Sequence, residues 1–301
     1  MTGTVEDPAL VEWCRVELGA PPARQLFALR STSDVTGLRL TDGREVVVKV
    51  RRDPVARVDA CLRLQSALFA SHYPCPRPLT EASVLGGMTA HAEEYVDLGE
   101  PLMGDDTALA VPLAAGFADL AERLDRFREL VDPQVLVPPP WLSWWSQRPW
   151  SRQPQVPDLV YDAADRVRAR LADVHLPGVL GHADWESQNL RWAQGRLVVV
   201  HDWDSLTWAP EAVLVGAAAA VFPAQSQQPE TASIASSATF LEHYQTARGR
   251  EFSADELEVA WAAGLLPALL NARNEVLEVR RPLVLDRLRE DCADRLRLAG
   301  A

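Results

Sequence analysis

The chain has 301 residues, enough for one large domain or two modest ones, and 48% of them are hydrophobic, so it can fill a substantial core. Its 42 acidic and 30 basic residues give a formal net charge of −12, which argues against a nucleic-acid-binding surface because such a surface needs a basic stripe. The longest apolar run, residues 212–222, is too short to cross a bilayer, which takes about 20 residues.

The N-terminal segment and the cysteines both indicate a cytoplasmic location. The N-terminal segment, residues 1–13, is acidic and lacks the apolar centre of a signal peptide. The four cysteines lie far apart without a C-x-x-C pair, which indicates reduced thiols and not a disulfide framework or a zinc site. We therefore expect a cytoplasmic protein with neither a membrane nor a nucleic acid as its partner.

The first third of the chain is predicted to be rich in β-strands. A short leading helix is expected over residues 5–18, and a helix over about residues 54–71 ends where the proline-containing segment after it begins. Strands are expected over residues 26–30, 35–40 and 45–50, with a hairpin turn at "TDG" between the last two.

Lys49 lies in the third of these strands, in "EVVVKV", and is the only lysine of the chain, since every other basic residue is arginine. A lysine in an apolar strand is costly unless it meets an anion. A compact ammonium suits phosphate oxygens in a narrow site where a planar guanidinium does not fit. The alternative is an edge lysine whose amine reaches solvent.

The remainder of the chain is predicted to be mainly helical. Apolar residues recur at helical spacing over residues 108–130 and 159–174. Ser253 and Glu256 form a capping-box pattern that opens another helix, and a last helix is expected over residues 283–298. Residues 224–237 read as a loop.

The strongest motif of the sequence is H-x-D-x4-N, formed by His182, Asp184 and Asn189. An apolar strand at 197–200 follows it and leads to Asp202. Phosphoryl transfer needs a carboxylate to orient the nucleophile and metal ions to neutralise the phosphates. Asp184 suits the first task. Asn189 and Asp202 offer the hard oxygen ligands that Mg²⁺ prefers.

This stretch resembles the Brenner-type motif of the aminoglycoside phosphotransferase and choline kinase-like family. The resemblance implies a protein-kinase-like α+β fold and ATP-dependent phosphorylation of a small molecule. It also implies roles for individual residues: Asp184 as the catalytic aspartate, Asn189 and Asp202 as metal ligands, and Lys49 on the nucleotide phosphates. His182 would brace the loop.

By the same resemblance, backbone groups from Glu94 to Val96 would bind the adenine edge of the nucleotide. The chain departs from the family pattern at three places, the first of which is Ala183, where the family usually has glycine. The helix after Lys49 contains no glutamate to pair with the lysine, and Asp59 is the expected replacement, unless it is an exposed helix carboxylate. The phosphate-covering loop lacks G-x-G, so that backbone amides and the hydroxyls of Ser31, Thr32 and Ser33 would hold the phosphates.

The residues that recognise the acceptor have no short motif. The tryptophans of the segment 138–157 would form either an aromatic wall over the acceptor or a connector packed on the helices. Trp185, next to Asp184, is the better pocket candidate by position. Three further polar residues would contact acceptor or metal, or else brace loops: Asp204, Glu186 and His201.

The sequence therefore predicts a bilobal α+β fold, with a nucleotide-binding lobe over residues 1–97 and a helical lobe over residues 98–301. The expected activity is ATP- and Mg²⁺-dependent phosphorylation of a hydroxyl on an aminoglycoside, another sugar or an amino alcohol. The alternative is a kinase-like nucleotide-binding regulator that has lost catalysis.

Overall fold

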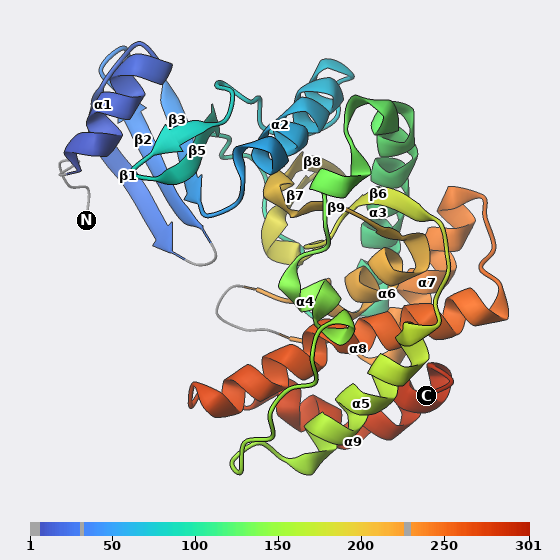
Figure 1. The fold of residues 1–301 in the computed structure, drawn as a ribbon. Coiled ribbons are helices and arrows are strands. Elements are labelled where there is room, and N and C mark those ends of the chain that lie inside the picture. The colour runs from blue at the N-terminus through green and yellow to red at the C-terminus, as the bar shows by residue number, and fades with distance from the viewer. Residues whose placement is uncertain (1–6, 31–32, 226–229) are drawn as a thin grey trace. The chain divides into compact units, whose positions relative to one another are not determined.

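The computed structural model describes residues 7–30, 33–225 and 230–301. The chain divides into two compact units, which are taken in turn below (Figure 1). Unit 1 contains the chain up to Gly99 together with Glu129–Leu136 and Val198–Asp204. Unit 2 contains Glu100–Arg128, Val137–Leu197 and Ser205–Ala301.

Unit 1 is built on an antiparallel sheet with the strand order β1-β2-β3-β5-β4 (Figure 1). The predicted strands and the hairpin turn are confirmed, and Gly43 in that turn has a φ of 91°, a backbone conformation that favours glycine. Its strands are β1 Pro22–Arg30, β2 Asp34–Leu40, β3 Glu45–Arg51, β4 Ser83–Leu85 and β5 Met88–Glu94. Its helices are α1 Pro8–Glu17 and α2 Val55–Ala70.

The alternation of side chains along β3 decides which residues reach the core under α1. Val46 and Val48 are fully buried in a cluster that includes Trp13 and Cys14 of α1. Because successive strand residues point to opposite faces, Lys49 projects from the other face of the sheet. The apolar run that surrounds Lys49 in the sequence thus serves two different sides of the sheet.

Unit 2 is largely helical, and it also contains short two-stranded pairings, β6 with β9 and β7 with β8. The strands are β6 Gly178–His182, β7 Leu190–Ala193, β8 Arg196–Val200, whose last residues belong to unit 1, and β9 Leu206–Pro210. The helices are α3 Thr107–Phe127, α4 Pro140–Ser143, α5 Asp158–Ala172, α6 Glu211–Val221, α7 Ile234–Arg248, α8 Ala254–Leu277 and α9 Leu283–Leu298. The predicted capping box at Ser253 is confirmed, as are the bounds of the last helix.

Helix α6 is buried within unit 2. Its residues from Ala212 to Val221 are all buried. It packs closely on α8, because a Cβ added to Gly216 would lie only 2.0 Å from the carbonyl oxygen of Ala260. Helix α3 packs on α7 through Phe117, whose ring centroid lies 5.8 Å from that of Tyr244.

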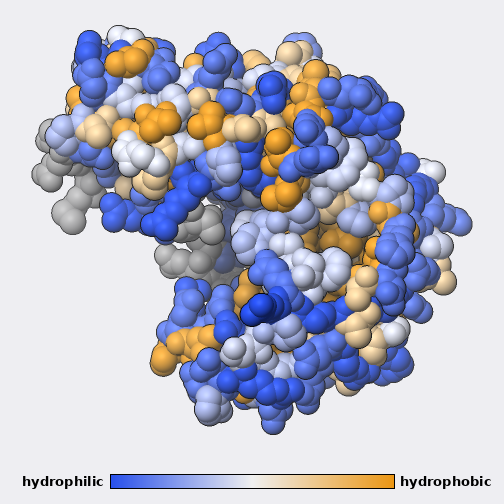
Figure 2. All heavy atoms as spheres, in the orientation of Figure 1, coloured by the Kyte–Doolittle hydropathy of each residue, from blue (hydrophilic) through white to orange (hydrophobic). Residues whose placement is uncertain are grey.

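The four cysteines are unpaired and buried, as the sequence predicted for reduced thiols. Across the described part of the chain, every helix is either too short or too polar to cross a membrane. Hydrophilic residues cover most of the face shown in Figure 2, with hydrophobic residues scattered among them, as expected from the high content of charged residues.

Candidate active site

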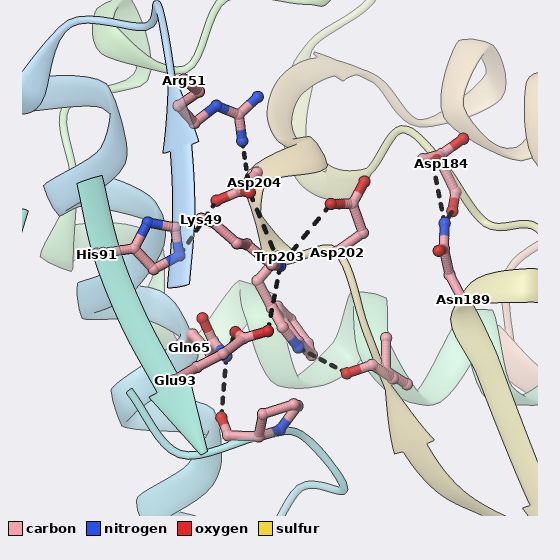
Figure 3. A network of polar contacts seen from close by, with 12 residues as sticks. Lys49, Arg51, Gln65, His91, Glu93, Asp184, Asn189, Asp202, Trp203 and Asp204 are labelled. Atoms are coloured by element: carbon pink, nitrogen blue, oxygen red, sulfur yellow. Dashed lines mark hydrogen bonds and ion pairs between the residues drawn. The ribbon is translucent and has the colours of Figure 1, made fainter. Parts of the chain in front are cut away.

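Lys49 is buried in unit 1 among carboxylates. Its side chain is only 6% exposed, and its Nζ lies 3.2 Å from Glu93 Oε1, 3.8 Å from Asp204 Oδ2 and 3.9 Å from Asp202 Oδ1 (Figure 3). Burial on its own lowers the pKa of this amine, but the three carboxylates outweigh burial and raise the pKa above its usual value. The only lysine of the chain is therefore a buried cation and not an edge residue that reaches solvent.

The ion-pair partner of Lys49 differs from the sequence-based expectation. Asp59 of α2 does not reach the lysine, because its Oδ1 instead accepts a hydrogen bond from the backbone N–H of Ala82 at 3.0 Å. The nearest carboxylate comes from Glu93 of β5, and Gln65 of α2 donates to the other oxygen of Glu93 at 3.0 Å. The helix thus supplies an amide, and a strand supplies the glutamate.

Asp202 has an unusual backbone conformation for a residue other than glycine, with a φ of 59°. The residue after it, Trp203, is 1% exposed, donates from Nε1 to the carbonyl of Val200 at 2.8 Å, and meets the Tyr73 ring edge to face. Asp204 is fixed by an ion pair at 2.6 Å with Arg51 of β3. The segment is therefore anchored on the C-terminal side of Asp202, which maintains its left-handed conformation.

Asp204 lies among basic side chains within unit 1. Besides Arg51 and Lys49, it faces His91 Nε2 at 3.7 Å (Figure 3). Burial would raise the pKa of Asp204, but the attraction of Lys49, His91 and Arg51 holds it well below the usual range. Of the roles that the sequence left open for Asp204, the contacts match the bracing one.

Asp184 and Asn189 lie together in the loop after β6, within unit 2. The backbone N–H of Asp184 donates to Nδ1 of the buried His182 at 3.2 Å. Asn189 ends a 3₁₀ turn, Ser187–Asn189, and its amide nitrogen donates to Asp184 Oδ2 at 2.8 Å and to the Asp184 carbonyl at 2.9 Å (Figure 3). His182 thus braces the loop, and the amide oxygen of Asn189 is the side-chain atom able to accept a cation.

Trp185 is not a pocket residue, contrary to the prediction. It is 0% exposed, its Nε1 donates to the carbonyl of Leu113 at 3.0 Å, and its ring packs 5.0 Å from that of Phe117. The backbone after Asp184 turns this side chain into the core. Trp185 therefore anchors the loop that carries Asp184 to helix α3.

The tryptophan-rich segment is mainly a packed connector. Trp144 is 3% exposed, donates from Nε1 to the carbonyl of Leu266 at 3.0 Å, and its ring centroid lies 4.2 Å from that of Trp150. Trp141, in contrast, is half-buried and directs its Nε1 toward the carbonyl oxygen of Ala183 at 3.5 Å. This places one aromatic ring beside the residue that precedes Asp184.

Glu94, Val96 and Ser33, which are also predicted to contact the nucleotide, belong to unit 1. The backbone N–H of Glu94 donates to the carbonyl of Arg77 at 2.9 Å, while Val96 and Ser33 are half-buried. Ser31 and Thr32 lie outside the described residues.

In unit 2, Glu186 accepts a hydrogen bond from Gln188 at 2.5 Å.

The structure adds residues that sequence reasoning missed: Glu93, Gln65, Arg51 and His91. The available signal was the glutamate pair that ends the strand in "AHAEEYV". A glutamate inside a β-run needs a cationic partner for the same reason as the lysine does.

Magnesium fits the donor atoms available. The described residues contain no cluster of three or more His, Cys, Asp and Glu side chains arranged for a metal. Mg²⁺, however, is commonly bound by one or two carboxylates and completed by phosphate oxygens and water. Asp202 in unit 1 carries a carboxylate and Asn189 in unit 2 carries an amide oxygen, and each is a donor atom of the kind that Mg²⁺ accepts.

A family model described as "Phosphotransferase enzyme family" matches residues 28–261. No curated protein matches the chain. Solved structures similar to this chain include an amicoumacin kinase in complex with AMP-PNP, Ca²⁺ and Ami, which is 12% identical with a TM-score of 0.66 over 89% of this chain and 85% of that one.

A second similar structure is a putative aminoglycoside phosphotransferase from Ralstonia eutropha JMP134. It is 16% identical with a TM-score of 0.63 over 97% of each chain. A third is a spectinomycin phosphotransferase in complex with ADP and spectinomycin, 11% identical with a TM-score of 0.60 over 99% of this chain and 94% of that one. At these identities the likeness establishes the fold, and the predicted kinase-like α+β class is confirmed.

Proposed function

Because the chain belongs to the phosphotransferase enzyme family, we propose that it is an ATP- and Mg²⁺-dependent kinase that phosphorylates a hydroxyl group of a small molecule. The observation that carries this proposal is the loop in which the amide of Asn189 fixes the carboxylate of Asp184 at 2.8 Å. A carboxylate held in this way is ready to accept a hydroxyl proton without first being reoriented.

In the proposed reaction, the carboxylate of Asp184 accepts a hydrogen bond from the acceptor hydroxyl and takes its proton. The hydroxyl oxygen forms a bond to the γ-phosphorus as the bond from that phosphorus to the bridging oxygen of ADP breaks. Asp202 and the amide oxygen of Asn189 would hold Mg²⁺, which when bound neutralises phosphate charge. The ammonium of Lys49 would donate to phosphate oxygens.

The conformation of Asp202 supports its role. Its backbone is held in the left-handed region by the anchored residues that follow it, so the carboxylate is presented in one direction. Strained backbone of this kind collects at functional sites, where the surrounding structure supplies the compensation.

For the acceptor, we propose a molecule with both hydroxyl and amino groups, such as an aminoglycoside, another amino sugar or an amino alcohol. The half-buried ring of Trp141 lies against the catalytic loop, and an aromatic face beside carboxylates favours a cationic amine. Two of the similar structures are of an amicoumacin kinase and a spectinomycin phosphotransferase, and their names support the same class of acceptor.

An acceptor screen that follows ADP release tests the proposal. The wild type should turn over at least one amino alcohol or amino sugar with ATP and Mg²⁺, and Asp184→Ala should lower kcat at least about 100-fold. Asp173→Ala, which removes an exposed carboxylate at the end of α5, should leave kcat unchanged.

Equal rates for the wild type and Asp184→Ala on every acceptor would refute the assignment of Asp184. Binding of MgATP without turnover of any acceptor would favour a nucleotide-binding regulator instead.

A further inference from the structure

Strand pairing places Glu93 on the same face of the sheet as Lys49. β3 and β5 are antiparallel, with Lys49 opposite His91 and Val47 opposite Glu93. Residues two apart on a strand share a face, so Glu93 is the diagonal neighbour of the lysine across the two strands. The side chain of Glu93 is 3% exposed and its Oε1 lies 3.2 Å from the amine.

Gln65 fixes the second oxygen of that carboxylate. Its amide nitrogen donates to Glu93 Oε2 at 3.0 Å and to the carbonyl of Pro76 at 2.9 Å, and the residue is 1% exposed. Both hydrogens of the amide are therefore used, and the amide has one orientation. Glu93 is left with one oxygen on Gln65 and the other directed to Lys49 (Figure 3).

We propose that Glu93, oriented by Gln65, is the positioning residue that holds Lys49 for the phosphates of the nucleotide. This rests on the proposed function, because it assigns a task to a residue that would act through the proposed phosphate-binding lysine. The ion pair lies within two hydrogen-bonded strands, so it does not require a carboxylate from helix α2. The amine lies 3.2 Å from Glu93 and 3.9 Å from Asp202, so its nearest partner is Glu93 and not the proposed metal ligand.

The single lysine makes this proposal directly measurable. An acylating reagent attacks only the neutral amine, and apart from the N-terminal amine Lys49 is the one target in the chain. In Glu93→Gln the nearest anion is lost, so the labelling rate of Lys49, followed by peptide mass spectrometry without nucleotide, should rise at least about tenfold. Glu81→Gln, an exposed carboxylate in the same unit, should label at the wild-type rate.

A charge-swapped variant separates positioning from mere stability. Because the amide of Gln65 and the carboxylate of Glu93 are hydrogen-bonded at 3.0 Å, Gln65→Glu combined with Glu93→Gln returns one carboxylate to the site. Glu93→Gln should raise KM for ATP at least about tenfold with a smaller change in kcat, and the swapped variant should recover most of that loss. Thermal melts of all variants confirm that each is folded.

The proposal is overturned if Glu93→Gln labels at the wild-type rate, or if the folded swapped variant leaves both labelling and KM as in Glu93→Gln. The proposed function has its own separate failure. If ATP with Mg²⁺ does not protect Lys49 of the wild type from acylation, the lysine does not bind phosphates. This result is independent of the labelling difference between the nucleotide-free wild type and Glu93→Gln, which reports on Glu93 alone.

Discussion

Three substitutions at Asp202 separate its backbone conformation from its carboxylate. With a φ of 59°, this residue lies where an L-amino acid other than Asn or Asp costs about 1–2 kcal/mol and glycine costs little. Asp202→Ala and Asp202→Gly both remove the carboxylate beside Lys49, so the difference between them isolates the backbone. We expect Asp202→Ala to be about 1–2 kcal/mol less stable than Asp202→Gly.

The assay is urea unfolding monitored by circular dichroism. The free energies of unfolding are compared between variants whose dependence on urea concentration, the m-value, is the same. Asparagine tolerates a positive φ as aspartate does but carries no charge. In Asp202→Asn the backbone conformation should therefore cost about as much free energy as in the wild type. All three variants should lose the Mg²⁺-dependent part of ATP binding. Equal stability of the alanine and glycine variants would refute the argument from the backbone, and an asparagine variant that still binds MgATP normally would refute the metal assignment.

Other substitutions test neighbouring parts of the account. Glu275→Ala should lower the free energy of unfolding by about 2–4 kcal/mol. The reason is that the buried carboxylate of Glu275 accepts hydrogen bonds at 3.0 Å from the backbone N–H groups of Val284 and Leu285 at the start of α9. A loss below about 1 kcal/mol in urea unfolding would contradict this. Val279→Gly should raise the melting temperature and increase the free energy of unfolding by about 1 kcal/mol, since this residue is 92% exposed with a φ of 54°. A lower melting temperature would contradict this. Lys49→Arg should reduce kcat/KM for ATP at least about tenfold, because a planar guanidinium is a poor substitute for a buried ammonium; wild-type kinetics would show that any cation suffices.

Local pattern predicted the elements well and the ion pairs poorly. Alternating valines and the turn at "TDG" identified β3, and a serine–glutamate capping box identified the start of α8. The partner of Lys49, however, depends on the register between β3 and β5, and no local pattern records that register. Asp59 was expected because it follows in the next helix, but the pairing of Val47 with Glu93 brings the strand residue closer.

The motif H-x-D-x4-N brought Asp184 and Asn189 to notice because the two residues are close together in the sequence, and in the structure they are hydrogen-bonded to each other. The neighbours of Asp184 were harder to assign, since adjacency in sequence does not tell whether a side chain enters a pocket or the core. Trp185 enters the core because the carbonyl of Leu113 and the ring of Phe117 receive it there. Trp144 is buried for a similar reason, with its indole N–H on the carbonyl of Leu266.

The most direct test is a thermal-shift titration with ATP, with and without Mg²⁺, of the wild type, Lys49→Met and Asn189→Ala. If Lys49 and Asn189 serve the same nucleotide, ATP should stabilise the wild type only when Mg²⁺ is present, by about 2.7 kcal/mol at a nucleotide concentration 100 times Kd. Each variant should lose most of that shift. A shift that does not need Mg²⁺, or that persists in Asn189→Ala, would contradict the account.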